Sequence, residues 1–224
     1  MNNTAFLTTV FPQNEKFLKP FFNSLSAQTH KDFDLVIVND NFKNLDYYKD
    51  LYSNLDIINI NSSNTPVKNR EVGINYCIEH KYEVLIFGDS DDYFANNRIE
   101  KSLELLKNTD VLVNDLSLFD SDGVYEKKYL SNRLKNLDVV DLEFIKDKNI
   151  FGMTNTAIKL ENICKVTFDD KIVAVDWFFF KKILKKGLKA VFTNETVSFY
   201  RQHENNSVGL CSENNKYYLW GEKK

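Results

Sequence analysis

The sequence predicts an α/β fold, in which a Rossmann-like, mostly parallel sheet is flanked by helices within a single domain. Three observations lead to this prediction. Short apolar runs of strand length alternate with segments of helical periodicity through the first half of the chain. The connections between them are short, as expected where helices join neighbouring parallel strands. The length of 224 residues, 43% of them hydrophobic, suits one domain with a sizeable core.

The predicted elements of the first half follow in regular order. Residues 33–38 (FDLVIV) and 83–87 (EVLIF) are continuous apolar runs, which is typical of strands buried on both faces. The other strands of this half are predicted at residues 5–10, 56–60 and 110–113. Helices are predicted at residues 14–25, 44–53, 66–80 and 96–107. Pro20 predicts a kink or a late start in the first of these helices.

The second half of the chain is less regular. Residues 120–123 (DSDG) predict a turn between two short strands, and a short helix is predicted at 139–147. A longer helix is predicted at 172–186, because Gly187 ends it and four lysines lie near its negative end. Two more strands are expected at 190–193 and 197–200. No repeat or linker divides the chain.

The composition excludes several classes of protein. The 29 Lys and Arg against 32 Asp and Glu give a net charge of −3, and no basic block stands out, so bulk charge predicts no nucleic-acid partner; a local basic groove is left open. No apolar run approaches the roughly 20 residues of a membrane-spanning helix, and no signal peptide is recognisable. Cys77, Cys164 and Cys211 are too far apart for a zinc site, which favours reduced thiols in a cytosolic protein.

Acidic residues follow the predicted strands at one edge of the sheet. Asp40 follows one strand, and Asp89, Asp91 and Asp92 follow another. In an open parallel sheet, ligands bind beyond the carboxyl ends of the strands. An extended segment places Asp89 and Asp91 on the same side, where they could share a divalent cation. The alternative is a solvated turn in which Asp92 caps the next helix.

An EF-hand is excluded as the explanation of these acids. Counting from Asp89, the twelfth residue is Glu100, as that motif requires. The sixth residue, however, is Phe94 where glycine is needed, and the fifth is Tyr93 where an oxygen ligand is needed.

Four other residues have a functional and a structural interpretation. Asp40 could contact a base or a ribose, or it could form an Asx turn. Arg70, with Lys68, could meet a diphosphate, or it could lie on a solvated helix face. Asp176 lies among apolar residues, where burial would raise its pKa toward the range of a general base; otherwise it faces water in the first turn of a helix. A lone histidine such as His203 is more often structural than a ligand.

Six segments, taken in order, resemble the family 2 glycosyltransferases of the GT-A fold, over nearly the whole chain. They are Asn14-Glu15 with residues 24–29 (SLSAQT), 33–40 (FDLVIVND), 70–74 (REVGI), 85–92 (LIFGDSDD), 175–177 (VDW) and 200–207 (YRQHENNS). The chain departs from the family's pattern at Asn39, which replaces an Asp, at Asn41-Phe42, which replace Gly-Ser, at Glu71, which replaces an Asn, and at Val175, which replaces a Glu.

The resemblance implies an inverting glycosyltransferase. Such an enzyme moves a sugar from a nucleotide diphosphate sugar, expected here to be a UDP-sugar, to a hydroxyl group of a glycan or lipid-linked acceptor in cell-surface polysaccharide synthesis. The implied cofactor is Mn²⁺ or Mg²⁺. The implied nucleotide-binding residues are Thr8, Pro12, Glu15, Asp40, Arg70 and Asp89. The implied metal-contacting residues are Asp91 and His203, and the implied catalytic base is Asp176.

The resemblance also implies a division of labour within the domain, with residues 1–115 holding the donor and 116–224 the acceptor. We expect a bacterial, cytoplasmic protein, with a peripheral position at the inner face of the membrane left open. A degenerate binding or assembly module is one alternative, which the departures at Glu71 and Val175 keep open. A sugar-phosphate nucleotidyltransferase is the other, but residues 9–14 lack the glycine-rich, basic loop that it needs.

Overall fold

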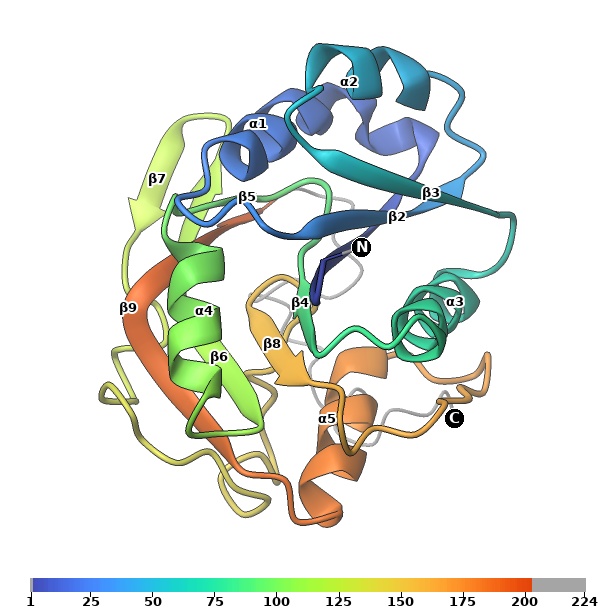
Figure 1. Ribbon diagram of the computed structural model, residues 1–224. Coiled ribbons are helices and arrows are strands. Elements are labelled where there is room, and N and C mark those ends of the chain that lie inside the picture. The colour runs from blue at the N-terminus through green and yellow to red at the C-terminus, as the bar shows by residue number, and fades with distance from the viewer. Residues whose placement is uncertain (1, 203–224) are drawn as a thin grey trace.

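A computed structural model of the chain describes residues 2–202 (Figure 1). In this part of the chain, nine strands form one sheet in the order β3-β2-β1-β4-β8-β6-β9-β5, with β7 paired to β6. The strands are β1 (Thr4–Val10), β2 (Asp34–Asp40), β3 (Asp56–Ser62), β4 (Val84–Phe87), β5 (Tyr93–Phe94), β6 (Val111–Asp120), β7 (Gly123–Glu126), β8 (Thr156–Lys159) and β9 (Ala190–Arg201). The helices are the short 3₁₀ turn η1 (Pro12–Asn14), α1 (Glu15–Ser26), α2 (Leu45–Leu51), α3 (Pro66–Glu79), α4 (Arg98–Leu106) and α5 (Val175–Lys185).

The predicted α/β fold is confirmed, although the sheet is mixed. β1 pairs in parallel with β2 and β4, and β2 pairs in parallel with β3. β8 is antiparallel to both β4 and β6, so β6 again runs in the direction of β4. β9 is parallel to β6. The carboxyl ends of β1, β2, β4, β6 and β9 therefore meet at one edge of the sheet.

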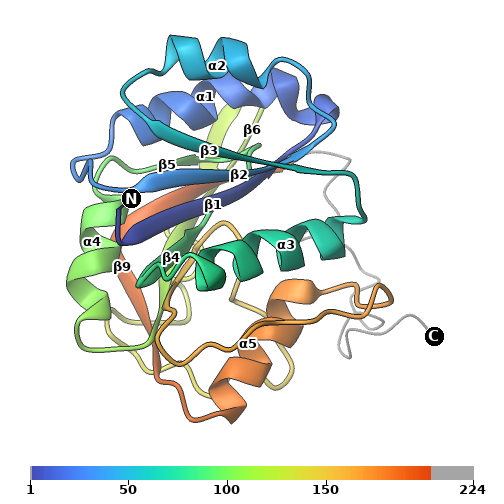
Figure 2. The same cartoon turned by 45° about the vertical axis from the view of Figure 1, so that its right-hand side comes forward.

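The core has two layers, one on each face of the sheet. Figure 2 shows α1 and α2 above the first strands and α3 and α5 below them. One cluster joins Leu18 and Phe22 of α1 to Leu35 of β2 and Ile99 of α4. The other cluster packs α3 and α5 against the opposite face. Because successive residues of a strand point to opposite faces, strands buried on both sides read as continuous apolar runs, as predicted.

Several details differ from the predicted elements. Residues 139–147 form no helix; Leu137 and Val140 donate backbone hydrogen bonds to the start of β9 instead. α1 begins at Glu15 and contains Pro20, which excludes the late start; the kink at Pro20 stays a prediction. The short strands β5 and β8 were not predicted. The two strands expected at 190–193 and 197–200 are one strand, β9, with a register shift against β6.

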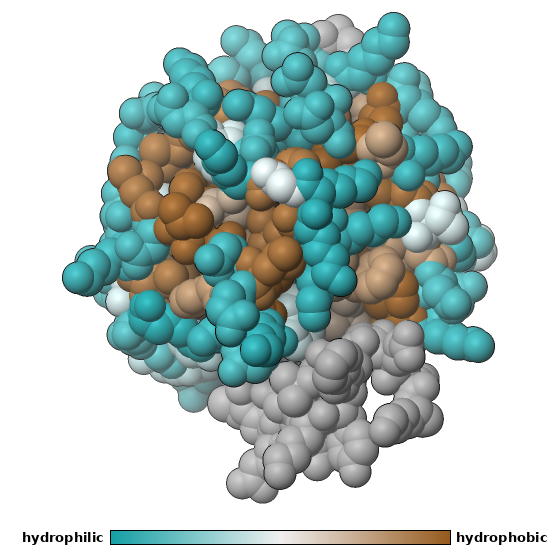
Figure 3. All heavy atoms as spheres, turned by 90° about the horizontal axis from the view of Figure 1, so that it is seen from below, coloured by the Kyte–Doolittle hydropathy of each residue, from teal (hydrophilic) through white to brown (hydrophobic). Residues whose placement is uncertain are grey.

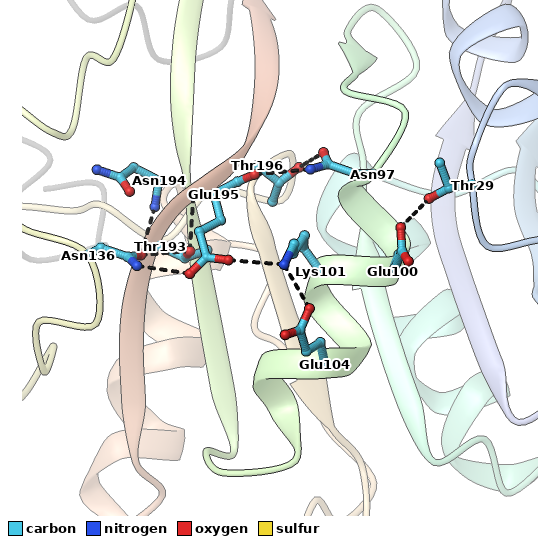
Figure 4. A network of polar contacts seen from close by, with 10 residues as sticks. All are labelled: Thr29, Asn97, Glu100, Lys101, Glu104, Asn136, Thr193, Asn194, Glu195 and Thr196. Carbon is cyan, nitrogen blue, oxygen red and sulfur yellow. Dashed lines mark hydrogen bonds and ion pairs between the residues drawn. The ribbon is translucent and has the colours of Figure 1, made fainter.

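A polar network holds the irregular part of β9 (Figure 4). Asn114 of β6 is opposite Thr193, but Asp115 is opposite Val197, so three extra residues bulge out of β9. Glu195, within the bulge, forms an ion pair with Lys101 of α4 at 3.1 Å and accepts a hydrogen bond from Asn136. Bulges bend a strand and redirect its side chains. The remainder of β9, which ends at Arg201, is thereby directed along β6 toward the carboxyl edge.

Apolar side chains also reach the surface at several points. Figure 3 shows them in brown, among hydrophilic side chains, on the face seen from below. Leu137 is 53% exposed and Val139 is 68% exposed. Scattered apolar residues are normal on the surface of a folded protein. No helix within residues 2–202 has the length and apolarity required to cross a membrane.

Gly88, directly after β4, allows the tightest packing below the carboxyl edge. A Cβ atom at this position would lie 2.3 Å from Cζ of Phe6 and 2.7 Å from Cζ of Phe94. Both rings are buried, so neither can move without disturbing the core. We expect Gly88→Ala to lower the free energy of unfolding by about 2 kcal/mol, the usual cost of overpacking.

Urea denaturation measures this effect, and Ser121→Ala in an exposed turn is the control, expected to change stability by less than about 0.5 kcal/mol. Equal stability of the two variants would show that the core at Gly88 can expand.

Candidate active site

A cavity of about 1140 Å³ lies at the carboxyl edge of the sheet. Both halves of the chain line it. Pro12, Asp40, Arg70, Asp89 and Asp91 come from the first half. The second half contributes Tyr129, Arg133, Met153, Asp176 and Tyr200. The predicted location of the site, beyond the strand ends, is therefore where the structure has its large cavity.

The acidic turn after β4 is fixed to the end of β1. Ser90 donates a hydrogen bond to the carbonyl oxygen of Thr9 at 2.8 Å and accepts one from the side chain of Asn14 at 3.0 Å. Ser90 and Asn14 are both buried. With Ser90 anchored below, Asp89 and Asp91 on either side of it line the cavity. This is the arrangement that alternation along the segment predicts.

Asp92 is buried behind the turn and caps no helix. α4 begins at Arg98, with Asn97 at its N-cap position, so the predicted capping role of Asp92 is wrong. The Asp92 side chain is fully buried and accepts a hydrogen bond from the backbone N–H of Arg201 at 2.7 Å. Arg201 also donates from Nε to the carbonyl oxygen of Asp91 at 2.8 Å. The end of β9 therefore holds the acidic turn from the side opposite β1.

The carboxylates in the cavity repel one another, and one arginine offsets part of that repulsion. Nη2 of Arg70 lies 4.0 Å from Oδ1 of Asp89. Removal from bulk water raises the pKa of Asp89 to about 6; Arg70 opposes this shift, and Asp91 and Asp176 add to it. Burial thus raises the pKa of Asp89 and that of Asp176, which is typical of a functional site, and a bound cation would relieve the repulsion among the carboxylates.

Asp176 lies in the first turn of α5 and faces the same cavity. Its Oδ1 accepts a hydrogen bond from the backbone N–H of Trp177 at 2.8 Å. Burial raises the pKa of Asp176, while Arg70, this backbone hydrogen bond and the side chain of Asn149 lower it in part. The indole of Trp177 donates to the carbonyl oxygen of Ile145 at 3.0 Å, which ties α5 to the loop that also carries Asn149. Asp176 is thus a positioned carboxylate with an elevated pKa.

Asp40, at the end of β2, is held by two amides. Its Oδ2 accepts a hydrogen bond from Asn69 at 3.0 Å, and its Oδ1 accepts one from Asn41 at 2.9 Å. Asn69 is itself buried in α3 and accepts a hydrogen bond from Ser62. Asn69 also lines the cavity, although it is not among the site residues predicted from the sequence.

Two departures from the family's pattern have local structural explanations. The Asn39 side chain donates to the carbonyl oxygen of Phe42 and accepts from its N–H, which closes the loop after β2; aspartate lacks the donor. Glu71 accepts from Lys68 at 2.9 Å and from the backbone N–H of Phe168 at 2.6 Å. Lys68 is therefore part of a clamp between α3 and residue 168, and it does not line the cavity.

The remaining predicted residues lie in different places. Pro12 lines the cavity, whereas Thr8 is buried within β1 and its neighbour Thr9 lines the cavity instead. Glu15 is exposed at the start of α1, where it accepts a hydrogen bond from Asn44. His203 lies outside the described residues. Thr8 and Glu15 are thus not among the residues that line the cavity.

Tyr200, part of the segment 200–207 that resembles the family's closing motif, also lines the cavity. It lies near the end of β9. Burial raises the pKa of its phenol, and the nearby Asp92, Asp89 and Asp91 raise it further. A neutral hydroxyl group therefore faces the acidic turn, and it can donate a hydrogen bond there.

The acids of the cavity suit a hard divalent cation. Within residues 2–202, no three His, Cys, Asp or Glu side chains are grouped closely enough to form a complete protein cage for a metal ion. Mg²⁺ and ions like it commonly use one or two carboxylates together with waters and substrate phosphates. Asp89 and Asp91 provide such a partial set of oxygen ligands, so the residues fit an ion that is completed by a diphosphate.

Comparison with known proteins agrees with the fold. The family model described as glycosyl transferase family 2 matches residues 7–158. The chain is 25% identical to the teichoic acid poly(glycerol phosphate) polymerase of Staphylococcus epidermidis over 228 residues, which is 99% of the chain and 29% of that protein.

Two solved structures share the fold. TarS 1–349 of S. aureus in complex with UDP-GlcNAc matches with a TM-score of 0.70 at 16% identity, covering 92% of this chain and 60% of that one. The mannosyltransferase PcManGT of Pyrobaculum calidifontis, in complex with GDP-Man and Mn²⁺, matches with a TM-score of 0.65 at 13% identity. The match covers 92% of this chain and 59% of that one. The chain spans less than a third of the polymerase and about three fifths of these two chains.

The family model and the shared fold identify this mixed sheet as that of a glycosyltransferase domain of the GT-A class. Because the family model covers well over half of the chain, the protein belongs to glycosyl transferase family 2. The predicted family and fold are confirmed.

Proposed function

We propose that the protein transfers a sugar from a nucleotide diphosphate sugar, a UDP-sugar by preference, to an acceptor hydroxyl in the synthesis of a cell-surface polysaccharide. One observation carries the proposal. Asp40, Arg70, Asp89, Asp91 and Asp176 come from four separate elements and line one cavity. The solved relatives named above were crystallised with UDP-GlcNAc and GDP-Man, and the polymerase is named for a teichoic acid.

In this proposal residues 1–115 bind the donor. The carboxylate of Asp40, held in place by Asn69 and Asn41, can accept the N–H of a uracil ring. Arg70 faces Asp89 across 4.0 Å, so its guanidinium is close enough to share the site with an anionic diphosphate.

Mn²⁺ or Mg²⁺ would be held by Asp91, with Asp89 beside it, and would neutralise charge on the departing diphosphate when bound. His203 remains a predicted further contact. The adjacent Tyr200 hydroxyl can donate a hydrogen bond to the same oxygens.

Asp176 acts as the general base in a single displacement. As the acceptor oxygen forms its bond to the anomeric carbon, its proton passes to the Asp176 carboxylate. The bond from that carbon to the diphosphate oxygen breaks, and the electron pair leaves with the diphosphate. One displacement of this kind inverts the anomeric centre. The raised pKa of Asp176 brings its basicity closer to that required near neutral pH.

Residues 116–224 provide the acceptor side in this proposal. The acceptor is a glycan or lipid-linked chain, and the cytoplasmic location expected from the sequence stays a prediction. The nucleotidyltransferase alternative lacks the loop that it needs, because residues 9–14, from the end of β1 through η1, contain no glycine, lysine or arginine.

We expect Asp91→Ala to abolish the contribution of the metal ion to donor binding. In isothermal titration calorimetry, the wild-type protein should bind UDP more tightly with Mn²⁺ than without it, and the variant should bind UDP equally weakly in both conditions. Asp46→Ala, on an exposed side chain of α2, is the control and should behave as wild type. Failure of the wild-type protein to bind any nucleotide with Mn²⁺ would instead favour the binding or assembly module.

A further inference from the structure

A short basic segment borders the cavity, which Arg133 lines and which Lys127, Lys128 and Lys135 flank in the sequence. Residues 127–135 (KKYLSNRLK) contain four cations, Lys127, Lys128, Arg133 and Lys135, and no acid, although the whole chain has a net charge of −3. We call this segment the basic lip. None of its four cations forms an ion pair with the residues that the structure describes. Elsewhere, lysines such as Lys68, Lys101 and Lys165 are paired with glutamates.

The basic lip is fixed to the sheet by a buried acid. The backbone N–H of Tyr129 donates to the carbonyl oxygen of Leu116 in β6 at 2.9 Å. Asp115, which is buried in β6, accepts hydrogen bonds from the N–H of Leu130 at 2.8 Å and from the hydroxyl of Ser131 at 2.5 Å. The backbone of the lip is therefore anchored to the sheet at residues 129–131, between its two pairs of cations.

The central part of the lip belongs to the cavity. Tyr129, Leu130 and Arg133 line it together with Asp176, the proposed base. The Arg133 guanidinium lies 4.9 Å from the centre of the Tyr129 ring, a contact that leaves its positive charge uncompensated by an acid. The donor residues Asp40 and Arg70 come from β2 and α3, in the other half of the chain.

We propose that the basic lip binds the phosphate groups of an acceptor chain whose hydroxyl is presented to Asp176. This inference rests on the proposed glycosyl transfer and specifies its acceptor as a polyanion. A neutral glycan would leave the charge of these cations uncompensated, whereas a chain with repeated phosphates can neutralise several of them at once. Arginine suits such a ligand, because its planar donors can engage two phosphate oxygens.

An anionic membrane is the competing ligand for such a segment, and the structure favours the soluble chain. The apolar residues of the lip point inward: Leu130 is 2% exposed and Leu134 is 5% exposed. Within residues 127–135 both leucines are therefore buried, so the lip itself has no exposed leucine for insertion between lipids, although Leu137 and Val139 beyond it are exposed. Its arginine also faces a cavity, which a flat bilayer surface cannot enter.

Binding of a fluorescent chain of ten glycerol phosphate units, measured by anisotropy on protein saturated with UDP and Mn²⁺, tests the inference. The triple variant Lys127→Gln/Lys128→Gln/Arg133→Gln should bind this probe at least about tenfold more weakly, and its affinity should depend less on salt concentration. The control Lys19→Gln/Lys43→Gln/Lys107→Gln removes the same charge at exposed positions outside the cavity and should bind the probe as wild type does. Both variants should bind UDP with Mn²⁺ normally.

Three outcomes would overturn the inference. Equal probe affinity in the lip variant and the control would show that the lip makes no contact with the chain. Equal affinity of the wild-type protein for a neutral dextran oligosaccharide would remove the need for phosphate. A lip variant that loses binding to phosphatidylglycerol vesicles but keeps binding to the soluble chain would assign the lip to a membrane. Absence of UDP binding in the wild-type protein, by contrast, would count against the proposed function itself.

Discussion

Replacing Asp176 by asparagine is expected to reduce sugar transfer by about 1000-fold while leaving donor binding unchanged. The amide keeps the size of the side chain and can still accept the hydrogen bond from Trp177, so the first turn of α5 should remain intact. It cannot take a proton from an acceptor hydroxyl. Single-turnover transfer from the UDP-sugar, together with calorimetric UDP binding in the presence of Mn²⁺, separates the two effects.

The control for this experiment is a second acid of the same cavity. Asp147 lines the cavity beside Lys148, which lies 3.9 Å from it, and no step of the proposed mechanism uses it. We expect Asp147→Asn to keep transfer within about threefold of wild type, because the loss of an exposed ion pair has a small effect. Full transfer by Asp176→Asn would mean that another group accepts the proton.

The dependence of transfer on pH gives a second measurement of the same role. Burial raises the pKa of Asp176 above the ordinary value of an aspartate, and the base works only when it is deprotonated. Transfer should therefore fall as the pH is lowered through this raised pKa, and the fall should begin at a higher pH than an ordinary aspartate would give. In the Asp176→Asn variant, the rate of the residual transfer should no longer fall as the pH is lowered.

The convergence of the acidic residues could be predicted from sequence, because it depends on local patterns. The runs FDLVIV and EVLIF place Asp40, Asp89 and Asp91 after buried strands, and parallel strands bring their carboxyl ends to one edge. The helical pattern of residues 172–186 likewise predicts that Asp176 lies near the start of a helix, and it lies in the first turn of α5. Each of these inferences needed only neighbouring residues and the handedness of the crossovers.

The parts that could not be predicted depend on partners far apart in the chain. β8 has only four residues, too few to give a clear strand pattern, and it is held in the sheet by pairing with β4 on one side and β6 on the other. Asn14 holds Ser90 across 76 residues, and Glu71 holds Phe168 across 97. Residues 139–147 show helical spacing, but backbone pairing of that region with β9 prevails over it. Such tertiary contacts leave no pattern in a single sequence.

The second large effect is expected at Arg98, whose side chain is fully buried beneath the acidic turn. Its Nη2 donates to the carbonyl oxygen of Phe87 at 2.6 Å, and its Nε donates to Oδ1 of Asn114 at 3.2 Å. The guanidinium lies 4.5 Å from the centre of the Phe94 ring. Burial lowers the pKa of Arg98 to about 9, while Asp92 and Asp89 oppose the shift, so the side chain is still a cation at neutral pH. The Arg98 cation and the Asp92 side chain are thus both fully buried, and they interact electrostatically.

Arg98→Met should therefore lower the free energy of unfolding by about 3–5 kcal/mol, the usual cost of leaving a buried charge uncompensated. The methionine fills much of the volume, but the Phe87 carbonyl and the Asn114 amide lose their donor. Urea denaturation gives the value, and Lys101→Met on the same helix is the matched control. Lys101 is partly exposed in its ion pairs with glutamates, so its loss should cost less than about 1 kcal/mol.

A double variant decides whether Arg98 acts through Asp92. If the cation offsets the buried carboxylate, Asp92→Asn should remove part of the need for it, and Arg98→Met/Asp92→Asn should be more stable than the sum of the single effects by about 1 kcal/mol or more. Strict additivity would show that Arg98 stabilises the protein only through its hydrogen bonds and ring contacts. An Arg98→Met variant as stable as the wild-type protein would contradict both roles, because a buried cation that an apolar side chain can replace without loss compensates nothing.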